Sequence, residues 1–208
     1  MDLLQRFAEF REKMRSPCQT GDPCQTGSLS QNGPTGPGEE GHRLVRQILD
    51  LEEEETPTGP CYFRQLAYPL RTRHGTCRLG SFLELPPEGL RLLATPPTSL
   101  PPREWVFLDV ETTGLAGGPG TIVFLCGVGH FAPDGTLLVR QYFAPDPASE
   151  PALMWAVSRD LRAFRGLFSV NGKAFDWPLL KDRLVLARQP LPPEPVHADL
   201  LFCARWLF

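Results

Sequence analysis

The sequence lacks the features that would assign the protein to a membrane or secreted class. It has no apolar run of the ~20 residues that a membrane-spanning helix needs. Its first 15 residues carry charges every few positions, so they do not resemble a signal peptide. These two absences lead us to expect a cytoplasmic protein.

Cysteine is present, but not in a metal-binding pattern. None of the six cysteines forms a Cys-x-x-Cys pair, and the four histidines lie far apart in the sequence. Cys126 and Cys203 stand in apolar runs, where a reduced, buried thiol is the simplest expectation. Cys18 and Cys24 belong to a duplicated six-residue repeat, which indicates a linker more than a disulfide or a metal loop.

Strong charge of one sign is also missing. The chain has 21 basic and 24 acidic residues, which leave a formal net charge of −3. This balance excludes a globally basic, histone-like nucleic-acid binder. It leaves room for a nucleic-acid enzyme, because a metal-dependent site is itself acidic and needs only a local basic rim.

The N-terminal region is poor in residues that could build a core. Residues 16–41 consist mainly of Gly, Pro, Ser, Thr and Gln, which predicts a disordered linker. Apolar residues at helical spacing predict a short helix at 2–15 and a second helix at about 42–55, which ends in four glutamates. We therefore assign residues 1–57 to N-terminal helices and a linker.

The next part of the chain is rich in strand-forming residues. We expect a short β-rich segment at 58–100, in which both CYFRQLAYPL and HGTCRLGSFLEL form strands. Three further strands are predicted at 104–110, 121–131 and 137–143, joined by hairpin turns.

Helical spacing takes over after the third of these strands. The pattern predicts a helix at 147–165, a short buried strand at 167–170, a helix at 178–188 and another helix from 197 onward. This order is similar to that of the ribonuclease H-like fold. That α/β fold is a mixed sheet of three antiparallel strands and βαβ crossovers, with flanking helices. We expect it over residues 103–208.

Two carboxylates share one face of the first of these strands, in the run Phe-Leu-Asp-Val-Glu-Thr-Thr-Gly. Because side chains alternate along a strand, Asp109 and Glu111 point the same way, with Cα atoms about 7 Å apart. Leu108 and Val110 fill the opposite face. Two uncompensated carboxylates are costly to bury, and a divalent cation is the usual compensation. Alternatively, the strand ends at Val110 and both acids are solvated.

A second polar cluster follows about sixty residues later, in Asn-Gly-Lys-Ala-Phe-Asp-Trp-Pro. A strand is predicted to end at Asn171 and Gly172, and a helix to begin near Asp176 with Pro178 in its first turn. Considered alone, Asp176 would be a helix cap, because Asp is favoured at that position and Pro just inside it.

Together the two clusters resemble the DnaQ-like (DEDD) superfamily of 3′–5′ exonucleases, and within it the YprB-type ribonuclease H-like domain. The family motif D-x-E is matched by Asp109 and Glu111. Its motif N-x-x-x-F-D is matched by Asn171, Phe175 and Asp176. The resemblance covers about residues 58–208. It extends to His74-Gly75, the loop at 114–120, Gln141-Tyr142-Phe143 and the stretch from His197 to Leu201.

The resemblance implies hydrolysis of phosphodiester bonds by a two-metal mechanism with Mg²⁺ or Mn²⁺, acting on a single-stranded 3′ end of nucleic acid. Asp109 would bridge the two ions, Glu111 would hold the water-activating ion, and Asp176 would bind the other. Substrate contacts would come from Thr112, Thr113, Gly114, Asn171 and Lys173.

One element of the family pattern is missing. The superfamily has a fourth carboxylate, an Asp four or five residues after a Tyr or His on its last helix. No such pattern follows Asp176. We therefore expect a truncated domain that is weakly active or inactive by itself. A non-catalytic nucleic-acid-binding or scaffold fragment of the same fold is the alternative.

Overall fold

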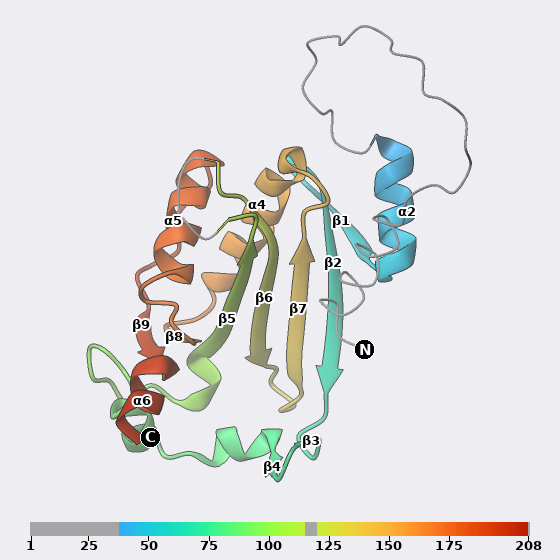
Figure 1. The fold of residues 1–208 in the computed structure, drawn as a ribbon. Helices are drawn as coiled ribbons and strands as arrows, with labels where there is room; N and C mark the ends of the chain where they lie inside the picture. The colour runs from blue at the N-terminus through green and yellow to red at the C-terminus, as the bar shows by residue number, and fades with distance from the viewer. Residues whose placement is uncertain (1–37, 115–119, 208) are drawn as a thin grey trace, which may run out of the picture. The chain divides into compact units, whose positions relative to one another are not determined.

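The structure is a computed structural model that describes residues 38–114 and 120–207 (Figure 1). The chain divides into two compact units, residues 1–51 and 52–208. The predicted helix at 2–15, the repeat with Cys18 and Cys24, and most of the predicted linker lie outside the described residues.

The helix predicted at 42–55 is wrong at both ends. Helix α2 begins at Glu39, inside the predicted linker, and ends at Leu49. Asp50 follows in the left-handed conformation, with φ of 58°, which ends a helix. The four glutamates after it lie instead in strand β1 (Glu52–Thr56), which pairs with strand β2. Sheet pairing therefore overrides their helical propensity.

A seven-stranded sheet is the centre of the second unit. Its strand order is β1-β2-β7-β6-β5-β8-β9. Neighbours are antiparallel from β1 to β5, and β8 and β9 continue the sheet in parallel. This arrangement confirms the predicted mixed α/β fold. The remaining strands of the sheet are β2 (Gly59–Tyr68), β5 (Trp105–Thr112), β6 (Val123–Phe131), β7 (Leu137–Phe143), β8 (Gly166–Ser169) and β9 (Val196–Asp199).

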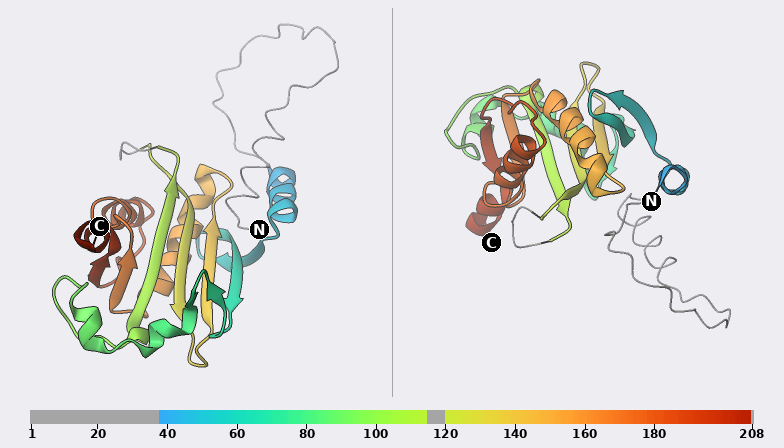
Figure 2. Two further views of the ribbon diagram at one scale, coloured as in Figure 1. Left: turned by 60° about the horizontal axis from the view of Figure 1, so that its bottom comes forward. Right: turned by 90° about the horizontal axis from the view of Figure 1, so that it is seen from above.

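Two helices pack against the same face of the sheet (Figure 2). They are α4 (Glu150–Leu161) and α5 (Asp176–Leu186), and their apolar side chains form one core with Val106, Leu108 and Val110 of β5. Cys126 of β6 is buried in this core as a free thiol, as predicted.

The opposite face is covered near the start of β5 by the segment between β2 and β5. Phe82 from this segment packs against Phe107, Phe131 and Phe168 of the sheet. Residues 79–84, predicted as strand, form a 3-10 helix, which brings Phe82 onto the sheet. The elements of this segment are β3 (Arg73–His74), β4 (Cys77–Arg78), the 3-10 helices Leu79–Glu84 and Pro102–Glu104, and α3 (Pro87–Arg91).

The C-terminal elements differ from the prediction in one respect. His197 to Asp199 lie in β9, and helix α6 (Leu200–Leu207) begins only after it. Parallel pairing with β8 holds these residues in the sheet. Among the described residues, no helix is long and apolar enough to cross a membrane.

Candidate functional site

The two carboxylates of β5 lie where the prediction places them. Leu108 and Val110 are buried against the helices, whereas Asp109 is exposed and Glu111 is half-buried on the other face. The parallel pairing of β5 with β8 ends at Phe107. Beyond Phe107 the backbone of β5 is not paired with β8, and this unpaired part of the strand carries Asp109 and Glu111.

Asp176 reaches this unpaired part of β5 from the start of α5. Its Oδ1 accepts a hydrogen bond of 3.3 Å from the Val110 N–H, and the residue is only 5% exposed. The residue in the cap position is Phe175, and no side chain caps the helix. The interpretation of Asp176 as a helix cap is therefore wrong, since its carboxylate binds β5, 66 residues away in the sequence.

Asp109 is close enough to both other carboxylates to perturb them. Burial, followed by the charge of Asp109, raises the pKa of Asp176 to about 6. Asp109 is exposed by surface area, but the protein atoms around its carboxylate displace part of the solvent and raise its pKa. Burial also raises the pKa of Glu111, and the charge of Asp109 adds to that shift. Concentrated negative charge of this kind favours the binding of a proton or a cation.

The turn that leads into α5 is fixed by Asp199, at the end of β9. Asp199 Oδ1 accepts hydrogen bonds from the N–H groups of Asn171 (2.8 Å) and Leu201 (3.1 Å), and Oδ2 accepts one from Lys173 (3.0 Å). Asp199 is 1% exposed, and it holds the backbone of Asn171 and Lys173 in the turn directly before Asp176. The sequence analysis missed this role, although an Asp that ends an apolar strand was a usable signal.

A buried pair lies beneath the same turn. Ser169 Oγ and His197 Nε2 are 2.7 Å apart, and burial together with the Lys173 charge lowers the pKa of His197 to about 4. Gly172 lies above the pair. A Cβ at this position would be 2.2 Å from Ser169 Oγ and 3.1 Å from Asp176 Oδ2. The turn therefore has no room for a side chain at residue 172.

The predicted substrate contacts after β5 have local partners. Thr112 Oγ1 donates to the Gly114 carbonyl at 2.8 Å, and Thr113 Oγ1 accepts from the Ile122 N–H at 3.1 Å. Both hydroxyls thus stabilise the exit of the chain from β5. The rest of the loop, residues 115–119, lies outside the described residues, and contact with a substrate stays a prediction.

The donor set agrees in its chemistry with a hard divalent cation, which prefers carboxylate oxygens. Asp109, Glu111 and Asp176 are the residues that could hold such an ion. In residues 38–114 and 120–207, however, no three Asp, Glu, His or Cys side chains converge closely enough to enclose a metal ion. The three carboxylates are neighbours, but their oxygens do not converge on a single coordination position.

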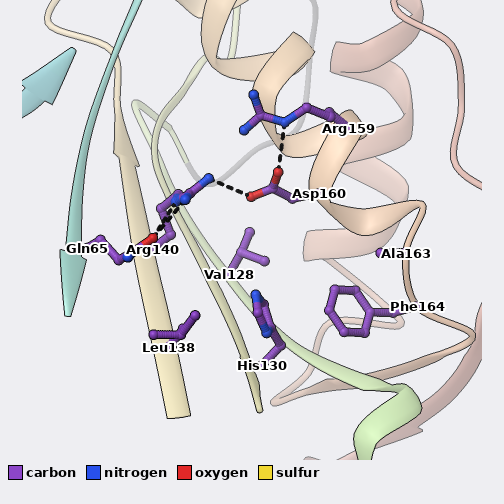
Figure 3. A pocket seen from close by; sticks show the side chains of 9 residues that line it. All are labelled: Gln65, Val128, His130, Leu138, Arg140, Arg159, Asp160, Ala163 and Phe164. Carbon is purple, nitrogen blue, oxygen red and sulfur yellow. Dashed lines mark hydrogen bonds and ion pairs between the residues drawn. The ribbon is translucent and has the colours of Figure 1, made fainter. Parts of the chain in front are cut away.

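A separate pocket of about 350 Å³ lies between β6, β7 and α4 (Figure 3). The Arg140 guanidinium donates to Gln65 and Asp160, while Arg159 donates to Asp160 and to both oxygens of Glu54. These bonds tie α4 to β1, β2 and β7, and they balance the charges within the chain. The pocket is lined by Gln65, Val128, His130, Leu138, Arg140, Arg159, Asp160, Ala163 and Phe164.

The fold and the site define a class of protein. Residues 106–207 match the family model described as the RNase_H superfamily, and they include β5 to β9 with all three carboxylates. This part of the chain is therefore an RNase H superfamily domain. The assignment is consistent with nuclease-type chemistry on nucleic acid.

The chain is also similar to a protein of Bacillus subtilis (strain 168), "Uncharacterized protein YprB". The two are 39% identical over 157 residues, which cover 71% of this chain and 37% of YprB. The similarity agrees with the YprB-type resemblance of the sequence motifs. The chain matches little more than a third of the length of that relative.

Proposed function

We propose that the domain is a metal-dependent 3′–5′ exonuclease of the DEDD type. The observation that carries the proposal is the bond from the Val110 N–H to Asp176, which brings a third carboxylate beside Asp109 and Glu111. Membership of the RNase H superfamily and the likeness to YprB support it. The D-x-E and N-x-x-x-F-D motifs supply the finer assignment.

In this proposal Asp109, Glu111 and Asp176 would hold Mg²⁺ or Mn²⁺. Such ions supply Lewis-acid stabilisation of the phosphate and a water nucleophile at neutral pH. The protein positions the substrate around them. Asp199 fixes the backbone of the turn that carries Asn171 and Lys173, directly before Asp176, so these two residues are the nearest candidates for contacts with the substrate.

A second candidate is a nucleic-acid-binding domain of the same fold without turnover. One observation favours it. Among the described residues, no three potential metal ligands converge.

Incubation with single-stranded DNA and RNA labelled at the 3′ end, with Mg²⁺ or Mn²⁺, separates the two candidates. Exonuclease action releases the label at once. Asp109→Asn should reduce the rate by about 10²–10³-fold, since removal of one group at a charge-stabilising centre has effects of about this size. Tight binding with no release of label would favour the non-catalytic domain. Release that is unchanged in Asp109→Asn would contradict the proposed site.

A further inference from the structure

The segment from Arg71 to Arg78 forms a short basic hairpin. Its sequence, Arg-Thr-Arg-His-Gly-Thr-Cys-Arg, has three arginines and a histidine but no acidic residue, and every residue from 73 to 78 is exposed. β3 pairs with β4 so that Arg73 lies opposite Arg78. The ion pair of Arg78 with Glu84 spans 3.6 Å between side chains that are each more than half exposed, so it neutralises little of this charge.

The base of the basic hairpin is held by backbone bonds. The Leu79 N–H donates to the Thr72 carbonyl (2.9 Å), and the Gly80 N–H donates to the Leu70 carbonyl (3.0 Å). A Cβ at Gly80 would lie only 2.8 Å from that carbonyl oxygen, so the close approach requires glycine. The arginines therefore project from a defined support that is joined directly to β2.

The basic hairpin lies at the opposite end of the sheet from the carboxylates. Figure 1 shows β3 and β4 at the lower end, whereas β5 ends at the upper end. The last residue of β2, Tyr68, pairs with Leu137, which pairs with Phe131, whereas Asp109 pairs with Gly127. Four residues along the strand and three strands across place Tyr68 roughly 20 Å from Asp109, and the basic hairpin begins three residues after Tyr68.

We infer that the basic hairpin binds phosphates of the nucleic acid that lie upstream of the end held at the carboxylates. The inference rests on the proposed function. Guanidinium groups bind phosphate oxygens in pairs of parallel hydrogen bonds, so exposed arginines suit this partner. A separation of roughly 20 Å corresponds to about six nucleotides of a stacked strand, at about 3.4 Å per nucleotide, and to fewer nucleotides of an extended one. A chain with a net charge of −3 also needs such a local basic surface to attract a polyanion.

The test compares wild type with the triple variant Arg71→Gln, Arg73→Gln and Arg78→Gln. Binding of fluorescent single-stranded oligonucleotides is measured by anisotropy in EDTA, where no hydrolysis occurs. For a 20-mer we expect roughly 10-fold weaker binding. The plot of log K against log salt should be less steep by about 2, because each phosphate contact on a single strand contributes about 0.7. A dinucleotide is too short to span the distance in any conformation and should bind both proteins equally.

A matched triple variant controls for net charge. Arg91, Arg162 and Arg165 are exposed and lie outside the hairpin, so their change to Gln removes the same charge elsewhere. This control should bind the 20-mer much as wild type does. Equal losses in both triple variants, no loss in the hairpin variant, or no binding of the 20-mer by wild type would each overturn the inference.

Binding and hydrolysis are read separately. Hairpin-dependent binding without release of a 3′ label would leave the inference intact while the exonuclease proposal fails. Hydrolysis of the 20-mer by wild type, with unchanged affinity in the hairpin variant, would support the exonuclease proposal and overturn the inference. Hairpin-dependent binding to phosphatidylserine vesicles, but not to the 20-mer, would show a membrane surface to be the partner and would also overturn the inference.

Discussion

At Asp176 the folded chain holds a carboxylate out of water and beside the charge of Asp109. The same side chain accepts a hydrogen bond from the Val110 N–H, which stabilises the fold. Its burial beside Asp109 destabilises the ionised form and so costs folding free energy at neutral pH. An amide could keep the bond and remove the charge. Asp176 is therefore a residue at which stability and the proposed function should change in opposite directions.

The first prediction concerns Asp176→Asn without metal. The pKa of Asp176 is about 6 in the folded protein and 3.8 as a model value. As pH rises from about 4 to 6, the unfolded chain ionises while the folded chain keeps its proton, so folding loses stability. Asp176→Asn removes this loss. It should raise the free energy of unfolding at pH 7 by roughly 1–3 kcal/mol.

Urea unfolding in EDTA at pH 7 and at pH 3.5 measures the effect. The two proteins should differ at pH 7 and nearly converge at pH 3.5, where Asp176 is protonated in the folded wild type and mostly protonated in the unfolded chain. A variant that is less stable than wild type at pH 7 would show that the carboxylate is held for structure.

The second prediction concerns His197. Its pKa is about 4 in the folded protein and 6.5 as a model value. As pH falls from about 6.5 to 4, the unfolded chain takes up a proton that the folded chain excludes, so the free energy of unfolding should fall by up to ~3 kcal/mol. His197→Gln, which keeps a group able to bond Ser169, should flatten this dependence. Parallel slopes for the two proteins in urea unfolding at pH 7, 5.5 and 4.5 would contradict the assignment.

At the scale of elements, the strands were easier to predict than the distant parts of the chain with which they pair. The alternation in β5 is a local property, so the shared face of Asp109 and Glu111 followed from spacing alone. Asp176 was harder, because its carboxylate binds an N–H that is open only where β8 ends. The helix predicted for the glutamates after α2 was wrong for a similar reason, because their strand β1 forms by pairing with β2. The role of Asp199 likewise depends on a turn that is distant in sequence.

The third prediction concerns the contact between α4, α5 and β6. Glu150 is 4% exposed, and its Oε1 accepts bonds from Arg183 Nε (2.8 Å) and from the Val123 N–H (2.9 Å). Glu150→Gln leaves a buried guanidinium without its carboxylate. It should lower the free energy of unfolding by about 3–5 kcal/mol, measured by urea denaturation.

A double variant shows whether charge pairing is the cause. Glu150→Met with Arg183→Met removes both charges and keeps apolar volume, so it should cost much less than Glu150→Gln alone. If the double variant is the less stable of the two, packing rather than the unpaired charge determines the effect.

At the scale of the second unit, residues 52–208, acidic and basic side chains are concentrated at opposite ends of the sheet. Carboxylates gather at the end where β5 finishes, and the basic hairpin projects from the other end (Figure 1). The net charge of the chain conceals this polarity, which is why composition alone was uninformative about a partner. A nucleic acid with its end at the carboxylates and its upstream phosphates at the hairpin would match both ends.

The most direct test of the account is the binding of Mn²⁺ to Asp109, Glu111 and Asp176, followed by titration calorimetry or by the loss of the free-ion paramagnetic resonance signal. Asp134→Asn, in an exposed turn at the other end of the sheet, is the matched control. We predict that wild type and Asp134→Asn bind Mn²⁺ alike and that Asp109→Asn weakens binding by at least ~10-fold, since each ligand supplies a formal charge. Equal Mn²⁺ affinity in all three folded proteins would contradict the account.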